Sequence, residues 1–557
     1  LTAAGAAGLA LPYRAAADPA ASRAGEWDAG ELAHLIPAAN HERVRIKASF
    51  QRPLDAAPEL RAGSRSTRGV RTDSQGRFWS FDLAVLDPAT RHRLELRDAA
   101  GKPLCESWDL ATFPAPDAEP ASFRVLIYTC AGGEDNLLLP DGRPLFLPMV
   151  DRRRLLNRGL SFAPDAVLAV GDHIYKDQLS GVMRTLGRFQ GGDQHGGELD
   201  PLGRSLLLDG PMHQAMRDRM EGTRLPIFDR SQPILGGPNE ELLVEIANHQ
   251  IANLYGTALR SVPSFLTQDD HDHFENDSTS ASYVTFPPDP FMLRAARATQ
   301  RLYYPELFPD RNLPRGLAGV DAGDRPPECS ESYGSVRWGR LAELLLFDCR
   351  RHLSLKGPSA GFVPPETESW LIGRLGARDV AHVAAVPSTP VAWSAGKWLE
   401  WYPDLLGPDG ALSAGRDKPY WQEGWFSQHN RLLEAAHDRD GVPLFVSGDL
   451  HSIASGRILR SRELDLRSNP VVSLLAGPLG SGVIWPSNSL SRGVRGTPPE
   501  WLEVDETLPC VENNGFTLLD FTPDAIEVRQ FRWLPGASSE PIETLQPFHT
   551  ERLERPA

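Results

Sequence analysis

Residues 169–175 read Ala169-Val170-Gly171-Asp172-His173-Ile174-Tyr175. The apolar run that ends at Val170 predicts a buried strand, and Asp172 follows directly after the glycine that ends it. Two further segments, Phe265 to Asp272 and Leu444 to His451, repeat this arrangement of an apolar run followed by Asp and His. Ligands of open α/β sheets bind at the carboxyl edge of the strands. The three segments therefore predict a site of carboxylates and imidazoles at the edge of one sheet, which suits hard or borderline metal ions.

The composition is that of an ordinary globular protein, with 41% apolar and 24% charged residues among 557. This length predicts at least two structural units. Lys and Arg number 58 against 73 Asp and Glu, a net charge of −15, which argues against a nucleic-acid groove. Small anionic substrates stay open, because bound metals can reverse the local field. No stretch is apolar for long enough to predict a transmembrane segment.

The first residues, Leu1 to Pro12, are typical of the core of an export signal, and Ala15 to Ala17 supply small residues for cleavage. We therefore predict a tail at residues 1–22 and an exported protein, periplasmic or secreted, with a disordered Ala-rich tail as the alternative. The number of cysteines is odd and no C-x-x-C spacing occurs, so neither a zinc ribbon nor a dense disulfide framework is expected. Apart from Cys130, whether these cysteines pair stays open: Cys105, Cys329, Cys349 and Cys510.

The N-terminal part predicts a small antiparallel β-sandwich domain over residues 23–118. Its strands are expected at residues 41–50, 77–87 and 92–98, with the sandwich closing near 108–113. The Pro- and Ala-rich segment 114–122 is the expected linker.

Residues 119–557 predict an α/β unit that opens with the apolar strand Arg124 to Cys130. Helical and strand patterns then alternate, which favours a layered sheet with helices on both faces. Helices are expected near 240–259, 291–304, 366–375 and 426–438, strands at 342–347, 380–386, 444–447 and 471–475, and a hairpin at 516–533. Residues 178–238 and 277–330 are rich in Gly and Pro and predict long loops over the active edge.

The candidate ligands follow four strand ends: Cys130, Asp172 with Tyr175, Asp270 with His271 and Asn276, and Asp449 with His451. An Asp on a tight turn after a strand can bridge two metals. A thiolate and a phenolate are anionic donors that favour a trivalent or soft ion, and ferric iron fits them. We expect Asp449 and His451 to lie on one side of an extended segment, and Asp269 and His273 to be solvated neighbours.

These motifs resemble the PhoD-like alkaline phosphatase family of the metallophosphoesterases. The family pattern is a Cys ending the first strand, then G-D-x-I-Y, D-D-H-E followed by Asn, and S-G-D-x-H. The chain has Thr129-Cys130, Gly171 to Tyr175, Asp269 to Asp272 with Asn276, and Ser447 to His451 in that order. The resemblance implies a metallophosphoesterase-type layered α/β sandwich after a β-sandwich, and a phosphatase or phosphodiesterase of small phosphate esters.

The resemblance also implies Fe(III) with Ca(II), and Zn or Mn are the alternatives. Cys130 and Tyr175 would bind iron, Asp172 would bridge, and Asp449, His451, Asn276 and Asp270 would complete the ligand sets. Attack by a metal-bound hydroxide would follow, with His271 protonating the leaving oxygen. The chain departs from the family pattern at Gln268, where Trp is usual, and at Lys176 and Asp272, where Glu is common.

Several alternatives stay open. The same scaffold could serve a phospholipase D-like or phosphotriesterase activity, and neither the substrate class nor the oligomeric state can be read from the ligands. Gly357 to Gly361 matches the G-x-S-x-G elbow of serine hydrolases with Ser359 as nucleophile, but no apolar strand runs into it. A non-enzymatic calcium-binding protein would explain the acidity but not Cys130 and Tyr175.

Overall fold

A computed structural model describes residues 27–133, 146–175, 228–229, 231–273, 288–310, 312–314, 325, 328–354, 359–394, 423–481, 495–536, 538 and 540–555. The predicted tail at 1–22, Lys176, Asn276 and most of the predicted loop at 178–238 lie outside these residues.

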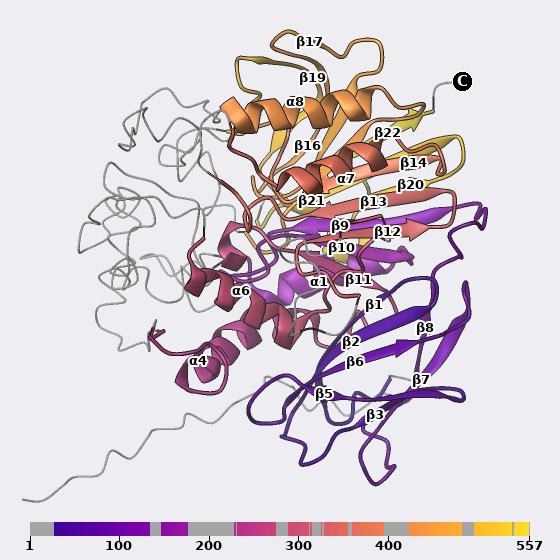
Figure 1. Cartoon of the computed structure of the whole chain (residues 1–557), viewed down its shortest axis with the longest axis vertical. Coiled ribbons are helices and arrows are strands. Elements are labelled where there is room, and N and C mark those ends of the chain that lie inside the picture. Colours follow the sequence, from indigo (N-terminus) through magenta and orange to yellow (C-terminus); the bar gives the residue numbers. More distant parts are fainter. Residues whose placement is uncertain are drawn as a thin grey trace, which may run out of the picture.

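The N-terminal unit is a β-sandwich of two four-stranded antiparallel sheets, drawn in indigo at the bottom of Figure 1. One sheet has the order β1 (Leu32–Ala39), β2 (Arg43–Phe50), β6 (Phe78–Ala84) and β5 (Val70–Arg71). The other has the order β4 (Arg65–Arg68), β3 (Glu59–Ala62), β7 (Arg91–Arg97) and β8 (Trp108–Ala111). Alternating apolar residues such as Val44, Ile46 and Phe81 fill the space between the sheets.

The second unit contains two larger mixed sheets. The six-stranded sheet has the order β11 (Ser264–Thr267), β10 (Ala166–Val170), β9 (Phe123–Thr129), β20 (Asn514–Phe521), β21 (Ala525–Trp533) and β22 (His549–Glu554). The eight-stranded sheet has the order β12 (Tyr333–Trp338), β13 (Ala342–Phe347), β14 (His382–Pro387), β15 (Leu444–Ser447), β18 (Val471–Ala476), β16 (Ile453–Ser461) and β17 (Leu464–Asp465), with β19 (Leu502–Val511) paired to β16.

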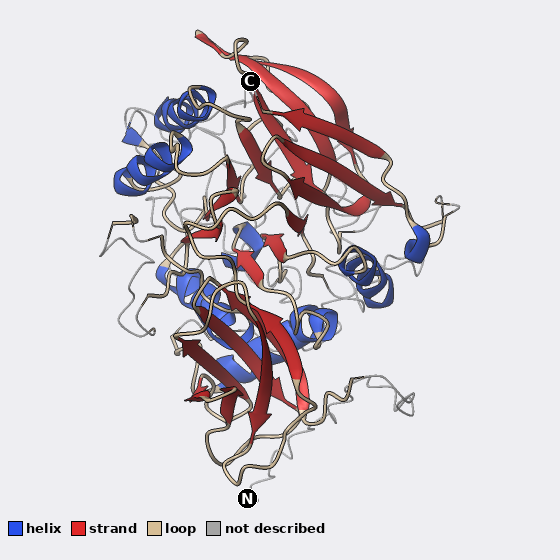
Figure 2. Cartoon of the chain, turned by 90° about the vertical axis from the view of Figure 1, so that its right-hand side faces the viewer, coloured by secondary structure: helices blue, strands red, loops and turns tan. Residues whose placement is uncertain are grey.

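The two sheets stack face to face, and the helices cover their outer faces (Figures 1 and 2). Ile127 of β9, Leu168 of β10, Leu344 of β13 and Val446 of β15 meet in the core between the sheets. Helices α1 (Met149–Leu160), α4 (Pro238–Ala247) and α6 (Pro290–Tyr303) contribute to the core on the outer face of the six-stranded sheet. Helices α7 (Pro365–Leu375) and α8 (Glu423–His437) cover the eight-stranded sheet.

This layering corrects the expectation of one sheet with helices on both faces. Each sheet has one helix-covered face and one face buried against the other sheet. Both faces of the central strands are apolar in either arrangement, so the sequence pattern could not distinguish them. Helix α6 matches the helix predicted near 291–304, so the wider segment 277–330 is not a loop throughout. After α4 the chain forms a π-helical turn, Asn248–Ala252, and a short α5 (Asn253–Tyr255) before β11.

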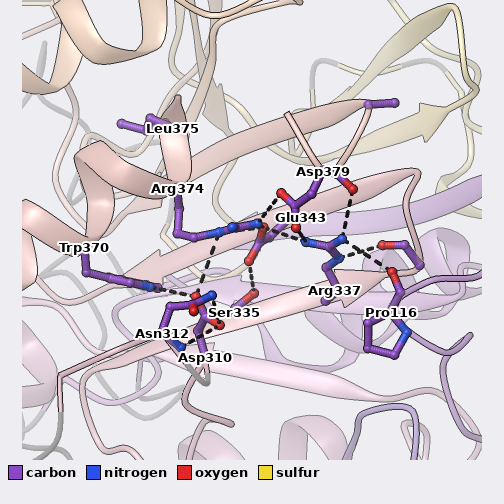
Figure 3. Close-up of polar contacts among 12 residues, drawn as sticks. Pro116, Asp310, Asn312, Ser335, Arg337, Glu343, Trp370, Arg374, Leu375 and Asp379 are labelled. Carbon is purple, nitrogen blue, oxygen red and sulfur yellow. Dashed lines mark hydrogen bonds and ion pairs between the residues drawn. The ribbon is translucent and has the colours of Figure 1, made fainter. Parts of the chain in front are cut away.

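The linker between the two units is anchored to the turn that joins β12 and β13. The carbonyl of Ala118 accepts from the backbone N–H of Arg340 at 2.8 Å. Trp338 Nε1 donates to Ser122 O at 2.9 Å. Arg337 Nη2 donates to Pro116 O at 3.4 Å (Figure 3). In the described part of the chain, no helix has the length and apolarity that a membrane crossing requires.

Candidate metal centre

Four strand ends form the site, and they come from both sheets. Cys130 follows β9, Asp172 follows β10, and Asp270 opens a 3₁₀ turn, Asp270–His273, shortly after β11. These three strands are parallel neighbours in the six-stranded sheet. Asp449 and His451 follow β15 of the eight-stranded sheet. The site therefore lies where the carboxyl edges of two stacked sheets meet, and the prediction of a single sheet edge was wrong.

The backbone of the site is strained. Cys130, Asp172, Asp449 and His451 have φ of 47°, 57°, 66° and 50°. Non-glycine residues rarely take positive φ, and each such residue costs on the order of 1 kcal/mol or more. Nine non-glycine residues have positive φ in the described part of the chain. Four of these nine lie at the candidate site, directly after three strands. Strain of this kind collects at functional sites.

Positive φ at Asp449 and His451 also shows that the segment Ser447 to His451 does not continue as a strand. The segment is a tight turn in which Leu450 N donates to Gly448 O at 2.9 Å. The prediction of an extended segment with both side chains on one side was therefore wrong. The turn, rather than a strand alternation, brings the two side chains to the same centre.

Cys130, Asp172 and His451 form the first of three groups whose ligand atoms lie within 4.8 Å of one another. Cys130 Sγ lies 3.3 Å from Asp172 Oδ2. Tyr175 Oη joins this group, at 3.1 Å from Asp172 Oδ2 and 3.0 Å from His451 Nε2. A thiol, a phenol, an imidazole and a carboxylate thus converge on one point.

Two neighbouring groups extend the cluster. Asp172, Asp270 and His271 form the second, and Asp269, Asp270 and Asp449 form the third. Asp172 is common to the first and second groups, so its carboxylate is placed to contact two cations. The imidazole of His271 also packs against the ring of Tyr175, with centroids 4.2 Å apart.

Local packing fixes the turns that carry these side chains. Asp272 accepts from the backbone N–H of Asp172 at 2.7 Å, of His173 at 2.9 Å and of Asp269 at 3.0 Å. A Cβ at Gly448 would collide with Thr129 Oγ1 and Val170 O, so only glycine permits this approach of the two sheets. Asp272, one of the departures from the family pattern, therefore holds the Asp172 turn in place.

Sequence reasoning missed a set of buried polar residues that contact the candidate ligands and their neighbours. Asp269 and His273 are fully buried rather than solvated, which corrects that prediction. Arg350 Nε donates to Asp269 Oδ1 at 2.9 Å, and its Nη2 lies 3.4 Å from Asp449 Oδ2. His273 Nε2 lies 2.9 Å from Asp348 Oδ2. The repeated D-D-H-D-H run was the one available signal, but the partners Asp348 and Arg350 are distant in sequence.

Another departure from the family pattern, Gln268, is also buried. Its Nε2 donates to Ala296 O at 3.0 Å and to Tyr304 Oη at 2.7 Å. These contacts tie the turn after β11 to helix α6. Lys176, the remaining departure, lies outside the described residues.

The raised pKa values of the buried acidic groups indicate a site whose anionic forms need a cation. Burial, together with the neighbouring Asp172, raises the pKa of the Cys130 thiol and of the Tyr175 phenol well above their usual values. Burial and the neighbouring Asp270 likewise raise the pKa of Asp172. The pKa of Asp269 is also raised by burial, although Arg350 acts in the opposite direction. Anionic forms of these groups repel one another in a dry site unless positive charge lies between them.

The donor atoms fit metal ions. Asp172 Oδ1 and Asp269 Oδ2 are buried and have no hydrogen-bond partner among the described residues. A buried carboxylate oxygen without a partner is unfavourable and commonly marks a bound ion or water. Sulfur, phenolate and imidazole donors suit a soft or trivalent transition metal, and the carboxylate-rich side suits a harder ion.

The structure thus brings together seven of the eight candidate residues: Cys130, Asp172, Tyr175, Asp270, His271, Asp449 and His451. Asn276 lies outside the described residues. All five cysteines are buried and unpaired, so the structure contains no disulfide between them. Ser359 is exposed, and β13 ends at Phe347, so no strand leads into it as a nucleophile elbow requires.

Comparisons with known proteins agree on the architecture. No family model and no curated protein sequence matches the chain. Among solved structures, that of PhoD matches with a TM-score of 0.55 and 13% identity, over 94% of this chain and 91% of that one. The purple acid phosphatase PPD1 from seeds of yellow lupin (Lupinus luteus) matches with a TM-score of 0.51 and 10% identity, over 94% and 74%. The chain shares the fold of these two structures, which confirms the predicted fold class.

Proposed function

We propose that the chain is a metal-dependent phosphoesterase that holds two cations on its buried acidic cluster. The observation that carries this proposal is the sharing of Asp172 between two ligand groups at the carboxyl edges of β9 and β10. Two-cation sites of this kind serve phosphoester hydrolysis. The likeness to PhoD and to a purple acid phosphatase supports the same reaction class.

The donor types suggest which cation each side takes. Cys130, Tyr175 and His451 with Asp172 would hold Fe(III), because thiolate and phenolate are anionic donors. Asp172 and Asp270, with Asn276 from the family resemblance, would hold Ca(II) through oxygen atoms. Zn(II) or Mn(II) are the alternative ions for the same cluster.

The bound cations would supply an activated water and offset the charge of the phosphoryl oxygens. The chain's own residues orient this chemistry. Asp272 fixes the Asp172 turn through three backbone bonds, and Arg350 holds Asp269 and Asp449. His271, at the edge of the cluster and 5% exposed, is the candidate that delivers a proton to the leaving oxygen.

Two substitutions test the assignment. Asp172→Ala should lose both the metals and turnover, because it removes the shared ligand. His271→Ala should keep the metals while turnover falls by roughly 10²–10⁴-fold, the usual contribution of a general acid. Elemental analysis by mass spectrometry and hydrolysis of a phosphoester panel, with and without a chelator, measure both effects.

The outcomes separate the candidate functions. Full activity of Asp172→Ala would reject the site, and loss of metal from His271→Ala would make His271 a ligand rather than a proton donor. Loss of activity in Ser359→Ala with insensitivity to chelation would favour a serine hydrolase. Bound calcium without any hydrolysis would favour a structural calcium-binding protein. The panel should span monoesters, diesters including phospholipid headgroups, and triesters.

A further inference from the structure

Gln250 is a buried polar residue that connects the two loops carrying the sulfur and phenol donors. It lies in the π-helical turn Asn248–Ala252 that follows α4. Its side chain is fully buried, and its Oε1 accepts from Gly133 N at 2.7 Å and from Tyr175 N at 2.8 Å. Gly133 belongs to the loop of Cys130, and Tyr175 is itself a candidate ligand.

These two bonds extend the pairing of the loops beyond their strands. Near the strand ends the loops are joined by backbone bonds, from Cys130 N to Gly171 O at 3.1 Å and from Gly132 N to Asp172 O at 2.9 Å. Beyond this point no further backbone bond joins them among the described residues. One oxygen atom of Gln250 then keeps Gly133 and Tyr175 close to each other, and so sets the separation of the two loops.

The orientation of the Gln250 amide is fixed by chemistry. Both of its partners are backbone N–H groups, which can only donate, so the oxygen must face them. The Nε2 group is buried on the other side and has no partner among the described residues. The hydrogen bonds of this side chain therefore all run through its oxygen, to one backbone N–H of each loop. Single π-helical turns are frequent at functional sites.

We propose that Gln250 is a positioning residue of the metal centre, which sets the distance between the Cys130 loop and Tyr175 so that thiolate and phenolate reach one cation. This inference rests on the proposed function insofar as a cation binds at Cys130 and Tyr175. Gln250 touches neither the cation nor the substrate; it acts through the backbone of the two loops.

The test compares Gln250→Met with a matched control, Gln428→Met. Gln428 is also a buried glutamine, and its Oε1 accepts from Phe362 N at 2.7 Å and from Val363 N at 3.2 Å, away from the candidate ligands. Both substitutions keep the volume and leave two backbone donors unpaired. Gln428→Met also removes the bonds that Nε2 donates to Val363 O and Glu368 Oε2, both at 3.0 Å, so it is the more severe structural change of the two. Each protein is loaded with Fe(III), and the measurements are iron affinity by chelator competition, the visible iron charge-transfer band, and the melting temperature.

Both variants should melt at lower temperature than the native protein. Gln250→Met alone should bind iron about 10- to 100-fold more weakly, the usual effect of a residue that orients ligands, and should shift the charge-transfer band. Gln250→Glu, whose carboxylate can still accept both bonds, should restore the band position. Native iron affinity and band in Gln250→Met, or equal weakening in Gln428→Met, would overturn the proposal.

Failure of this inference is distinguishable from failure of the proposed function. A native protein that binds iron but hydrolyses no phosphoester would reject the function and leave the positioning role in place. A Gln250→Met variant with native iron binding and a native protein with phosphoesterase activity would do the reverse. A native protein that binds no iron would overturn the positioning role together with the iron assignment.

Discussion

At the scale of single residues, the site combines backbone strain with buried charge. Cys130, Asp172, Asp449 and His451 take positive φ, and their acidic groups are crowded in a region of little solvent. Either feature alone reduces the stability of the folded chain. Bound cations would offset the charge repulsion, so the strained turns are best understood as the geometry that such cations require.

His34 offers a residue-scale prediction about pH. It lies at the interface of the β-sandwich with the second unit, where Nε2 lies 2.6 Å from Tyr303 O and Nδ1 lies 3.1 Å from Ser49 Oγ. Burial lowers its pKa from 6.5 to about 4, although the bond to Tyr303 acts in the opposite direction. As the pH falls below 6.5, His34 becomes protonated in the unfolded chain but stays neutral in the folded chain until the pH nears 4. The contribution of His34 is therefore complete above pH 6.5 and is lost progressively towards pH 4, amounting to about 3 kcal/mol.

Urea unfolding at pH 7 and pH 4.5 would measure this loss. His34→Gln, which keeps a donor for Tyr303 O, should lose less stability between the two pH values than the native protein. His92→Gln, whose ring contacts Asp87 O and Thr112 Oγ1 within the sandwich, is the control for loss of a histidine away from Tyr303. An identical pH dependence for the native protein and His34→Gln would contradict the prediction.

Some residues of the centre are predictable from sequence and others are not. Asp172 and Asp449 follow an apolar run and a glycine, so their place at a strand end can be read directly. Asp269, Arg350 and Gln250 cannot be found this way, because their partners lie far along the chain. Burial of Asp269 depends on Arg350, which lies 81 residues away. Roles that depend on such a tertiary partner have no local sequence pattern.

At the scale of elements, the sequence predicts most strands of the parallel regions but not their grouping into sheets. β13, β15 and β18 are short apolar runs bounded by polar residues, and such runs are typical of buried strands. β19 and β22 were missed because much of their length is exposed and charged, as in edge strands. Which sheet a strand joins depends on long-range pairing, such as β9 with β20, and this pairing leaves no local signal.

Glu343 on β13 gives a prediction at this scale. Its side chain is 2% exposed, and it pairs with Arg337 of β12 at 3.3 Å and with Arg374 of α7 (Figure 3). Asp379 joins both arginines, at 2.9 Å and 3.0 Å. Glu343→Gln removes the buried carboxylate that pairs with both arginines and leaves them only the more exposed Asp379, so it should lower the free energy of unfolding by about 1–3 kcal/mol.

Denaturant unfolding of Glu343→Gln and Glu503→Gln would check this value. Glu503 on β19 also pairs with two arginines, Arg460 at 3.1 Å and Arg467 at 2.8 Å, but it is 38% exposed. Its removal should change the free energy of unfolding by less than about 1 kcal/mol, as is usual for surface pairs. Equal effects of the two substitutions would show that burial of Glu343 does not determine the strength of its pairing.

At the scale of the whole molecule, a buried series of ion pairs runs from the β-sandwich towards the metal centre. Lys47 of β2 pairs with Glu306 at 3.1 Å, and Arg325 pairs with Glu306 at 3.0 Å and with Glu331 at 3.1 Å. Glu331 also pairs with Arg351. The backbone N–H groups of Arg350 and Arg351 both donate to Asp348 Oδ1, beside the cluster of candidate ligands. The predicted boundary at residues 118 and 119 stays a prediction, and these contacts argue that the two units are stable only together.

Lys47 is the sandwich residue that belongs to this series of ion pairs. Its substitution therefore tests whether one unit depends on the other for its stability. Lys47 and Glu306 are 3% and 2% exposed. Because Arg325 still pairs with Glu306 at 3.0 Å, Lys47→Met should lower the free energy of unfolding by about 1–3 kcal/mol. A double-mutant cycle with Glu306→Gln should give a coupling energy of about 1–3 kcal/mol, because the two charges are in direct contact. The control cycle pairs Arg52 with Glu31, which are 75% and 36% exposed, and should give less than about 1 kcal/mol. Unfolding curves recorded by tryptophan fluorescence and by circular dichroism should coincide in the native protein. Two separate transitions in the native protein would mean that the sandwich folds independently of the unit that holds the metal centre. A Lys47 coupling as small as that of Arg52 would mean that this ion pair does not link the two units.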